Sequence, residues 1–282
     1  MCPLSMHISG SAGFCPGVER ALQLTLQAVA EAPKPINTLG PLIHNPTVVS
    51  DLETKGVGVL SQVDSDIAGT VILRSHGVPR AVEEELTRLG VQVVDATCPF
   101  VTSAQEKAAR LNEEGYLVII LGDYDHPEVL ALRSYAGESS LVVQSSEDLP
   151  DQLPSTRIGV VVQTTQSEER LATLVERLAP RSRELLVHNT ICSATEQRQT
   201  AALAMAADVD VVVVVGGAES GNTRRLAEIC RGTQPATYHV EYPDQLDPVW
   251  FEKAEVVGLT AGASTPAEQI EAVAAALREM KP

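Results

Sequence analysis

Short apolar runs without polar alternation recur along the chain, and they are rich in β-branched residues. They are VILRS (71–75), LVIILG (117–122), IGVVVQ (158–163), VDVVVVVGG (209–217) and VVGLTAG (256–262). Runs of this kind are typical of parallel strands that helices cover on both faces. Stretches with helical periodicity lie between them, at 19–32, 81–90, 167–179 and 266–280. Strand and helix therefore alternate, which predicts an α/β fold with mainly parallel sheets.

One sequence motif is repeated where a predicted strand is followed by a predicted helix. DATCPFVTSAQEK (95–107) and NTICSATEQRQTA (189–201) share a strand end, a cysteine and a helix start, and SAGFCPGVERALQ (11–23) is a looser third copy. The cysteines are Cys15, Cys98 and Cys192. The repeat predicts three pseudo-threefold-related α/β units around a shared centre, at 14–97, 98–191 and 192–282. For residues 1–13 we consider packing on the third unit.

Polar side chains follow the other strand ends within each predicted unit. Ligands of open parallel sheets bind at the carboxyl ends of strands, so these side chains are the candidate site. In the pairs Thr164-Thr165 and Ser264-Thr265 we expect one residue to cap the following helix and the other to face a ligand. The candidates are His44, His76, His126, Glu128, Thr164, Thr165, Ser220, Asn222 and Ser264.

Composition narrows the class of protein. The formal net charge is −16 and the pI about 4.8, so the surface repels nucleic acid and anionic membranes. No apolar run approaches the ~18 residues of a membrane span, and the first residues do not resemble a signal peptide. We therefore expect a cytoplasmic protein with neither a nucleic-acid nor a membrane partner. Five cysteines, an odd number, do not suggest a disulfide framework.

Three thiols at one centre have several uses. They can bind zinc, supply a nucleophile, or hold an iron–sulfur cluster, and three thiolates would leave one iron of a 4Fe-4S cluster open. A helix start after each cysteine lowers the pKa of the thiol and stabilises an anionic cluster. Buried core cysteines are the ordinary alternative, and we keep that interpretation for Cys2 and Cys230.

The histidines and the segment GGAESGNTRRL (216–226) point to an anion. His44, His76 and His126 each precede a turn residue, where side chains project from strand ends. The glycine-rich segment precedes a helix and offers the Ser220 hydroxyl, the Gly221 backbone N–H and the Asn222 amide to a phosphate. It matches neither the dinucleotide fingerprint nor the Walker A loop.

These motifs resemble those of one enzyme family. In order they are GFCPGVERA, IHNP, SHGV, DATCPFVT, DHPEV, QTTQS, ICSAT, ESGNTRRL and TAGAST, and they span nearly the whole chain. They resemble the 4-hydroxy-3-methylbut-2-enyl diphosphate reductases of the methylerythritol phosphate isoprenoid pathway. The resemblance implies one 4Fe-4S cluster with an open fourth iron site, bound by Cys15, Cys98 and Cys192 at the centre of the three units.

The resemblance also implies roles for the polar residues. Glu128 in DHPEV matches the acid that delivers a proton. One residue of the Thr164-Thr165 pair matches a substrate-contacting threonine. Many members have two successive serines where this chain has Ser220-Gly221, which leaves a backbone N–H in place of a hydroxyl. The residues that match the diphosphate site are His44, His76, His126, Ser220, Gly221, Asn222 and Ser264.

The implied reaction is the reductive dehydroxylation of an allylic diphosphate to isopentenyl and dimethylallyl diphosphate. Two electrons come from an external donor of the ferredoxin or flavodoxin type, because the sequence has no flavin or nicotinamide motif. One alternative is a paralogous iron–sulfur reductase of another allylic phosphate. Others are a non-catalytic iron–sulfur sensor or electron carrier, and a zinc-stabilised binding protein.

Overall fold

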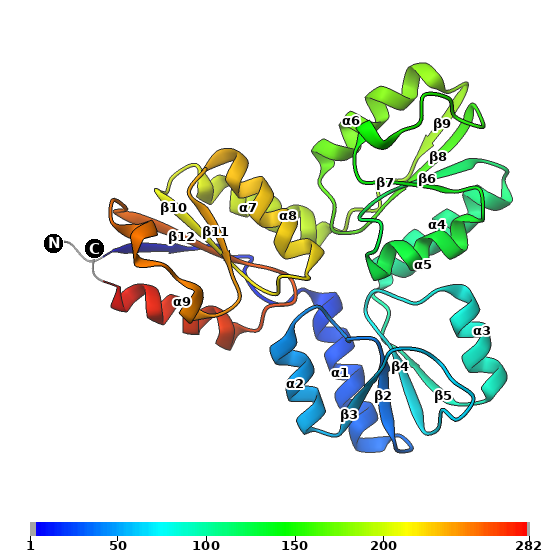
Figure 1. Ribbon diagram of the computed structural model, residues 1–282, viewed down its shortest axis with the longest axis horizontal. Helices are drawn as coiled ribbons and strands as arrows, with labels where there is room; N and C mark the ends of the chain where they lie inside the picture. Colours follow the sequence, from blue (N-terminus) through cyan, green and yellow to red (C-terminus); the bar gives the residue numbers. More distant parts are fainter. Residues whose placement is uncertain (1–3, 281–282) are drawn as a thin grey trace. The chain divides into compact units, whose positions relative to one another are not determined.

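The computed structural model describes residues 4–280, which form two compact units (Figure 1). One unit contains residues up to 18, 44–48 and 193 onward, and the other contains 19–43 and 49–192. Within the described residues the strands form three sheets of four, and every pairing is parallel. The predicted α/β class is confirmed. The three-unit boundaries at 14–97, 98–191 and 192–282 stay a prediction.

The larger unit contains two of the sheets. The first has the order β3-β2-β4-β5, with β2 (Ile36–Leu39), β3 (Val57–Leu60), β4 (Thr70–Leu73) and β5 (Gln92–Asp95). The accompanying helices are α1 (Pro16–Glu31), α2 (Pro46–Thr54) and α3 (Arg80–Leu89). All four residues of the inner strand β4 are buried.

The second sheet of this unit has the order β7-β6-β8-β9. Its strands are β6 (Leu117–Leu121), β7 (Leu141–Val143), β8 (Arg157–Val162) and β9 (Glu184–Val187), and its helices are α4 (Pro99–Glu113), α5 (Pro127–Ala136) and α6 (Glu168–Leu178). Val118 and Ile120 pack with α4 and α5 on one face of the sheet. Ile119 and Leu121 pack with α6 on the other. Burial on both faces explains why this run has no polar alternation.

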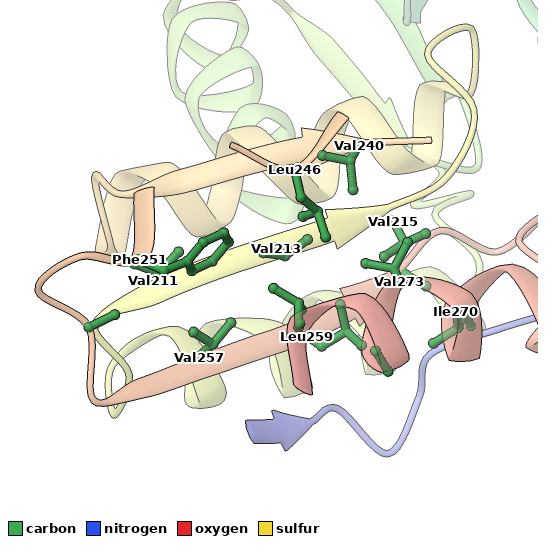
Figure 2. Close-up of a cluster of buried hydrophobic side chains, with 14 residues drawn as sticks. Val211, Val213, Val215, Val240, Leu246, Phe251, Val257, Leu259, Ile270 and Val273 are labelled. Carbon is green, nitrogen blue, oxygen red and sulfur yellow. The ribbon is translucent and has the colours of Figure 1, made fainter. Parts of the chain in front are cut away.

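The smaller unit contains the third sheet, of order β1-β12-β10-β11. Its strands are β1 (Ser5–Ile8), β10 (Val211–Val215), β11 (Thr237–Val240) and β12 (Val256–Ala261), and its helices are α7 (Ser193–Ala206), α8 (Gly221–Thr233) and α9 (Ala267–Glu279). One face of β10 packs with α9 in the apolar cluster that Figure 2 shows. The other face packs with α7 and α8. Short 3₁₀ turns occur at Ser146–Asp148, Ala179–Arg181, Pro243–Gln245 and Pro248–Phe251.

All three sheets have one topology. Each sheet has two inner strands and two edge strands, and one of the edge strands leads to a cysteine. These edge strands are β5, which leads to Cys98, β9, which leads to Cys192, and β1, which leads to Cys15. In the third sheet the edge strand comes from the opposite end of the chain, because β1 pairs with β12 from Ser5 opposite Val256 to Ile8 opposite Leu259. The sequence repeat thus corresponds to a repeat of sheet topology.

The predicted long elements are confirmed, with ends shifted by a few residues. Helices α1, α3, α6 and α9 and strands β4, β6, β8, β10 and β12 lie where the pattern put them. The capping prediction was wrong: Ser167 caps α6 by accepting from Arg170 N, and Pro266 occupies the N-cap of α9. No helix within residues 4–280 combines the length and apolar character needed to cross a bilayer.

Candidate active site

The three cysteine loops are built alike within their own units. Cys98 is the N-cap of α4, and Cys15 and Cys192 directly precede α1 and α7. In each case the cysteine N–H donates to a carbonyl two residues beyond the end of the neighbouring inner strand. The acceptors are Ser75 O for Cys98 at 2.9 Å, Thr164 O for Cys192 at 3.1 Å and Ala263 O for Cys15 at 3.0 Å.

Two of these loops also share a side-chain turn. Asp95 Oδ1 accepts from Thr97 N at 2.8 Å, just before Cys98. Asn189 Oδ1 accepts from Ile191 N at 3.1 Å, just before Cys192. An Asp or Asn that bonds the backbone two residues on forms a local turn, so the repeated phrases DATC and NTIC encode the same bend.

The donor set fits a group bound by thiolates. Cys15, Cys98 and Cys192 are half-buried thiols at helix starts. Cys230 is different, because it is fully buried in the apolar cluster between β10 and α8, and burial raises the pKa of its thiol to about 11. Cys230 is therefore a core residue, as the sequence indicated. Cys2 lies outside the described residues.

Glu128 is a buried carboxylic acid in the first turn of α5. Its side chain is 1% exposed. Its Oε1 accepts from Thr164 N at 2.6 Å, and its Oε2 accepts from the Thr164 hydroxyl at 2.8 Å. The pKa of Glu128 is raised from 4.5 to about 7, because the effect of burial exceeds the lowering by the two bonds from Thr164 and the nearby charge of Asp123 adds a smaller increase. Desolvation is the dominant effect, so Glu128 exchanges its proton near neutral pH.

His126 precedes Glu128 and caps the same helix. Its Nδ1 accepts from Glu128 N at 3.2 Å, so a neutral ring carries its proton on Nε2. The His76 ring lies edge-on to the His126 ring, with centroids 5.3 Å apart. Ser75 holds the His76 loop, since its backbone N–H and its hydroxyl both donate to Leu42 O. The two predicted histidines of this unit are therefore neighbours.

The structure gives the two threonines of QTTQS different contacts. Thr164 binds Glu128 with its backbone N–H and its hydroxyl, and its carbonyl accepts from Cys192 N. The Thr165 hydroxyl accepts from Gln163 Nε2 at 3.0 Å. Gln163 also binds the backbone N–H of Asp123 through Oε1 at 2.9 Å. Thr164 thus connects Glu128 to the loop of Cys192. Thr165 instead bonds Gln163, which holds the loop at Asp123.

In the other unit, helix α8 begins at the predicted anion-binding segment. Ser220 is its N-cap and accepts from Thr223 N at 3.3 Å, and Gly221 opens the helix. Asn222 Oδ1 accepts from Ala263 N at 2.9 Å. Among residues 4–280, the buried Asn222 Nδ2 has no hydrogen-bond partner. A buried donor in this state is suited to an anionic ligand, and the bond to Ala263 fixes which way the amide points.

The segment that carries His44 is held against the same unit. The Ser264 hydroxyl donates to His44 O at 3.5 Å. Asn45 Oδ1 accepts from Val48 N at the start of α2, and Asn45 Nδ2 donates to Gln269 Oε1 at 2.9 Å. A Cβ at Gly217 would lie 2.5 Å from His44 O, so only glycine permits this approach. Asn45 and Gln269 were not among the residues predicted from the sequence. For Asn45 the available signal was the helix start Asn-Pro.

Half-buried thiols that directly precede helices and a buried carboxylic acid in the first turn of a helix, in a fold of parallel sheets, fit an α/β enzyme that binds a group through thiolates and has an internal proton donor. The chain belongs to the LytB protein family, whose profile matches residues 6–278. Iron–sulfur chemistry is a property of that family.

Curated relatives match over nearly the whole length. A protein of Geobacter sulfurreducens named 4-hydroxy-3-methylbut-2-enyl diphosphate reductase is 49% identical over 276 residues, which are 98% of both chains. A protein of the same name from Aquifex aeolicus is 42% identical over 276 residues, covering 97% of this chain and 96% of that one.

Two solved structures have the same fold. One is described as (E)-4-hydroxy-3-methyl-but-2-enyl diphosphate reductase, the terminal enzyme of the non-mevalonate pathway; it is 42% identical with a TM-score of 0.70 and covers 98% of this chain and 99% of that one. The second, the E-1-hydroxy-2-methyl-but-2-enyl-4-diphosphate reductase of Plasmodium falciparum, has a TM-score of 0.89 at 24% identity and covers 96% of this chain and 86% of that one. At that identity the second match supports the fold alone.

Proposed function

We propose that the chain reduces 4-hydroxy-3-methylbut-2-enyl diphosphate, the substrate named for its relatives, to isopentenyl and dimethylallyl diphosphate. The reaction consumes two electrons and two protons, replaces the allylic hydroxyl by hydrogen and releases water. Relatives at 42–49% identity over almost the full chain support this activity. The observation that carries it is Glu128, a buried acid with a pKa of about 7 held by two bonds from Thr164.

Cys15, Cys98 and Cys192 hold one 4Fe-4S cluster with an open fourth iron site. When bound, the cluster supplies electrons one at a time and a Lewis-acidic iron. Half-buried thiols at three helix starts support this ligand set, as do the repeated bonds from cysteine N–H groups to strand-end carbonyls. The protein's part is to keep the thiolates anionic and the loops rigid.

Glu128 supplies the proton that lets the hydroxyl leave as water. The Thr164 N–H can only donate, so it keeps Oε1 as an acceptor and leaves Oε2 as the oxygen that carries the proton. The Thr164 hydroxyl bonded to Oε2 can both accept and donate. It can therefore take the Glu128 proton while passing on its own, which makes Thr164 a relay as well as a support.

The diphosphate is held by donors at strand ends and at the start of α8. They are His44, His76, His126, Ser220, Gly221, Asn222 and Ser264. The buried Asn222 Nδ2, which lacks a partner among residues 4–280, supports this assignment, as does the Nε2 proton of a neutral His126. Each charge-assisted bond to phosphate contributes on the order of 1.5–3 kcal/mol.

An external carrier of the ferredoxin or flavodoxin type delivers the electrons. The test of the activity avoids that unknown partner: anaerobically purified protein receives a chemical reductant and the diphosphate alcohol, and the products are identified by mass spectrometry and NMR. We expect isopentenyl and dimethylallyl diphosphate. Unreduced alcohol from protein with a full iron content would instead favour a paralogous reductase of another allylic phosphate.

A further inference from the structure

A buried arginine holds the loop that leads to Cys15. Arg198 lies on α7, is 4% exposed, and donates from one terminal guanidinium nitrogen to Gly13 O at 2.6 Å. Gly13 has a φ of +111°, a conformation that other residues rarely adopt, so the chain turns sharply there. Two residues later the Cys15 N–H donates to Ala263 O. The Cys15 segment is therefore fixed at one end by a strand end and at the other by a guanidinium.

The same kind of contact occurs before a second cysteine, in the other unit. Arg20 donates to Thr97 O at 3.0 Å, and Thr97 directly precedes Cys98. The two arginines have related places in the sequence. Arg20 follows Cys15 by five residues on α1, and Arg198 follows Cys192 by six residues on α7. In both cases an arginine that lies one to two helical turns after one cysteine donates to a backbone carbonyl in the loop that precedes a different cysteine.

Arg198 differs from Arg20 because it is buried, whereas Arg20 is exposed. Burying a guanidinium costs several kcal/mol unless negative charge or strong acceptors lie nearby. A thiolate-bound cluster is anionic, so a fixed cation beside a cysteine loop gains a favourable interaction there. The planar guanidinium also restricts the direction of the Gly13 carbonyl more than a neutral amide would.

We propose that Arg198 is a positioning residue for the cluster ligand Cys15. It fixes the segment from Gly13 to Cys15, and its charge favours the reduced, more negative state of the cluster. The proposal rests on the proposed function only in taking Cys15 as a cluster ligand.

The test compares holoprotein of the wild type with Arg198→Gln, Arg198→Lys and the control Arg231→Gln. Arg231 makes the same kind of bond in the same unit, to Thr237 O at 3.2 Å, and this carbonyl belongs to none of the loops that carry Cys15, Cys98 and Cys192. The measurements are the rate of iron release to a chelator and the midpoint potential of the cluster by redox titration followed by EPR. Neither depends on turnover.

We expect Arg198→Gln to release iron about 10- to 100-fold faster, which corresponds to the loss of one charged hydrogen bond. Its midpoint potential should fall, because removing a positive charge disfavours reduction. Arg198→Lys keeps the charge and should keep the potential, while iron release rises because the planar bond is lost. Arg231→Gln should match the wild type in both measurements.

The proposal is overturned if Arg198→Gln behaves like Arg231→Gln. If Arg198→Gln does not fold, Arg198→Lys decides: wild-type iron release with the charge retained would show that the guanidinium bond does not hold Cys15. A wild-type protein that binds the cluster but leaves the diphosphate alcohol unreduced contradicts the proposed function and leaves this test intact. A wild-type protein without iron contradicts both.

Discussion

Thr164 donates to both carboxylate oxygens of Glu128, from its backbone N–H at 2.6 Å and from its hydroxyl at 2.8 Å. The same residue accepts from the Cys192 N–H through its carbonyl. One threonine therefore connects the buried acid to the loop of a cysteine. We therefore expect a substitution at Glu128 to affect the Cys192 loop, and a substitution in that loop to affect Glu128.

Replacing Glu128 by Gln should leave iron content and substrate affinity close to wild type and lower turnover by roughly 10²–10⁴-fold, the usual effect of a positioned acid. The amide keeps the size of the side chain but has no proton to transfer. Steady-state assays with a chemical reductant measure this. Glu138→Gln, at an exposed position just after α5, is the control and should be silent. A Glu128→Gln enzyme within about threefold of wild type would remove Glu128 from the mechanism.

Thr164→Val should raise the pKa of Glu128, because the lost hydroxyl bond stabilised the charged form. Activity needs the protonated acid, so the alkaline limb of the pH profile of kcat/KM should move to higher pH. Maximal turnover should also fall, since the relay hydroxyl is gone. Thr164→Ser keeps the hydroxyl and should restore the wild-type limb. An alkaline limb that stays in place or moves to lower pH contradicts the assignment.

The raised pKa of Glu128 also makes stability depend on pH. The unfolded carboxyl ionises near 4.5, while the folded one keeps its proton up to about 7. Between these values the folded state binds more protons, so this contribution is fully present below pH 4.5 and is lost as pH rises through 7. The total is roughly 3 kcal/mol at ~1.36 kcal/mol per pKa unit.

Glu128→Gln removes that dependence. Its free energy of unfolding relative to wild type should therefore increase between pH 4.5 and 7 and remain constant above. Denaturant titrations of both proteins across this range measure the difference, in which the other titrating groups cancel. A difference independent of pH would mean that Glu128 titrates normally.

Replacing Cys15, Cys98 or Cys192 by Ala should abolish activity and strongly lower iron content, since each supplies one proposed ligand. Cys230→Ala should keep both, because its thiol is buried in the core and its pKa is raised to about 11. Its cost should be limited to ~1 kcal/mol of folding stability for the small cavity. Iron analysis of the four variants after anaerobic reconstitution checks this. Bleaching by Cys230→Ala alone would refute the ligand set.

The substitution Asn222→Asp tests the role of the Nδ2 donor separately from that of the Oδ1 acceptor. The carboxylate still accepts from Ala263 N, but a negative oxygen replaces the buried Nδ2 donor. We expect a KM raised at least tenfold, since a donor is lost and a charge now repels the diphosphate. The iron content should be normal. Asn112→Asp, on the exposed surface of α4, controls for the added charge. An unchanged KM would exclude Asn222 from the substrate site.

The sequence was most informative about features that depend on a few neighbouring residues. The bend before Cys98 and Cys192 is encoded within four residues. A short apolar run such as 117–121, between helical stretches, favours a buried inner strand, and the structure has one there. The sequence could not show which of Thr164 and Thr165 bonds Glu128. That choice depends on Glu128 approaching from α5, 36 positions away in the chain.

Other features have no local signal at all. Strand β1 is short and mostly exposed, so it has no run of apolar residues from which it could be predicted. Its partner β12 lies near the other end of the chain, so the pairing has no local signal either. Thr165 and Ser167 are both good capping residues, and only the path of the loop selects Ser167. Arg198 looks like a solvated residue in a polar helix, and its burial comes entirely from tertiary packing.

The pairing of β1 with β12 has a consequence for the order of events during synthesis. Cys15 leaves the ribosome early, but the strand and the carbonyl that hold its segment, β12 and Ala263, are translated about 250 residues later. At about 5–20 residues per second this is a wait of roughly ten to fifty seconds. A nascent chain can complete the Cys98 and Cys192 loops during that time, yet it cannot complete the third. The proposed set of three cysteine loops is therefore complete only after Ala263 has been translated.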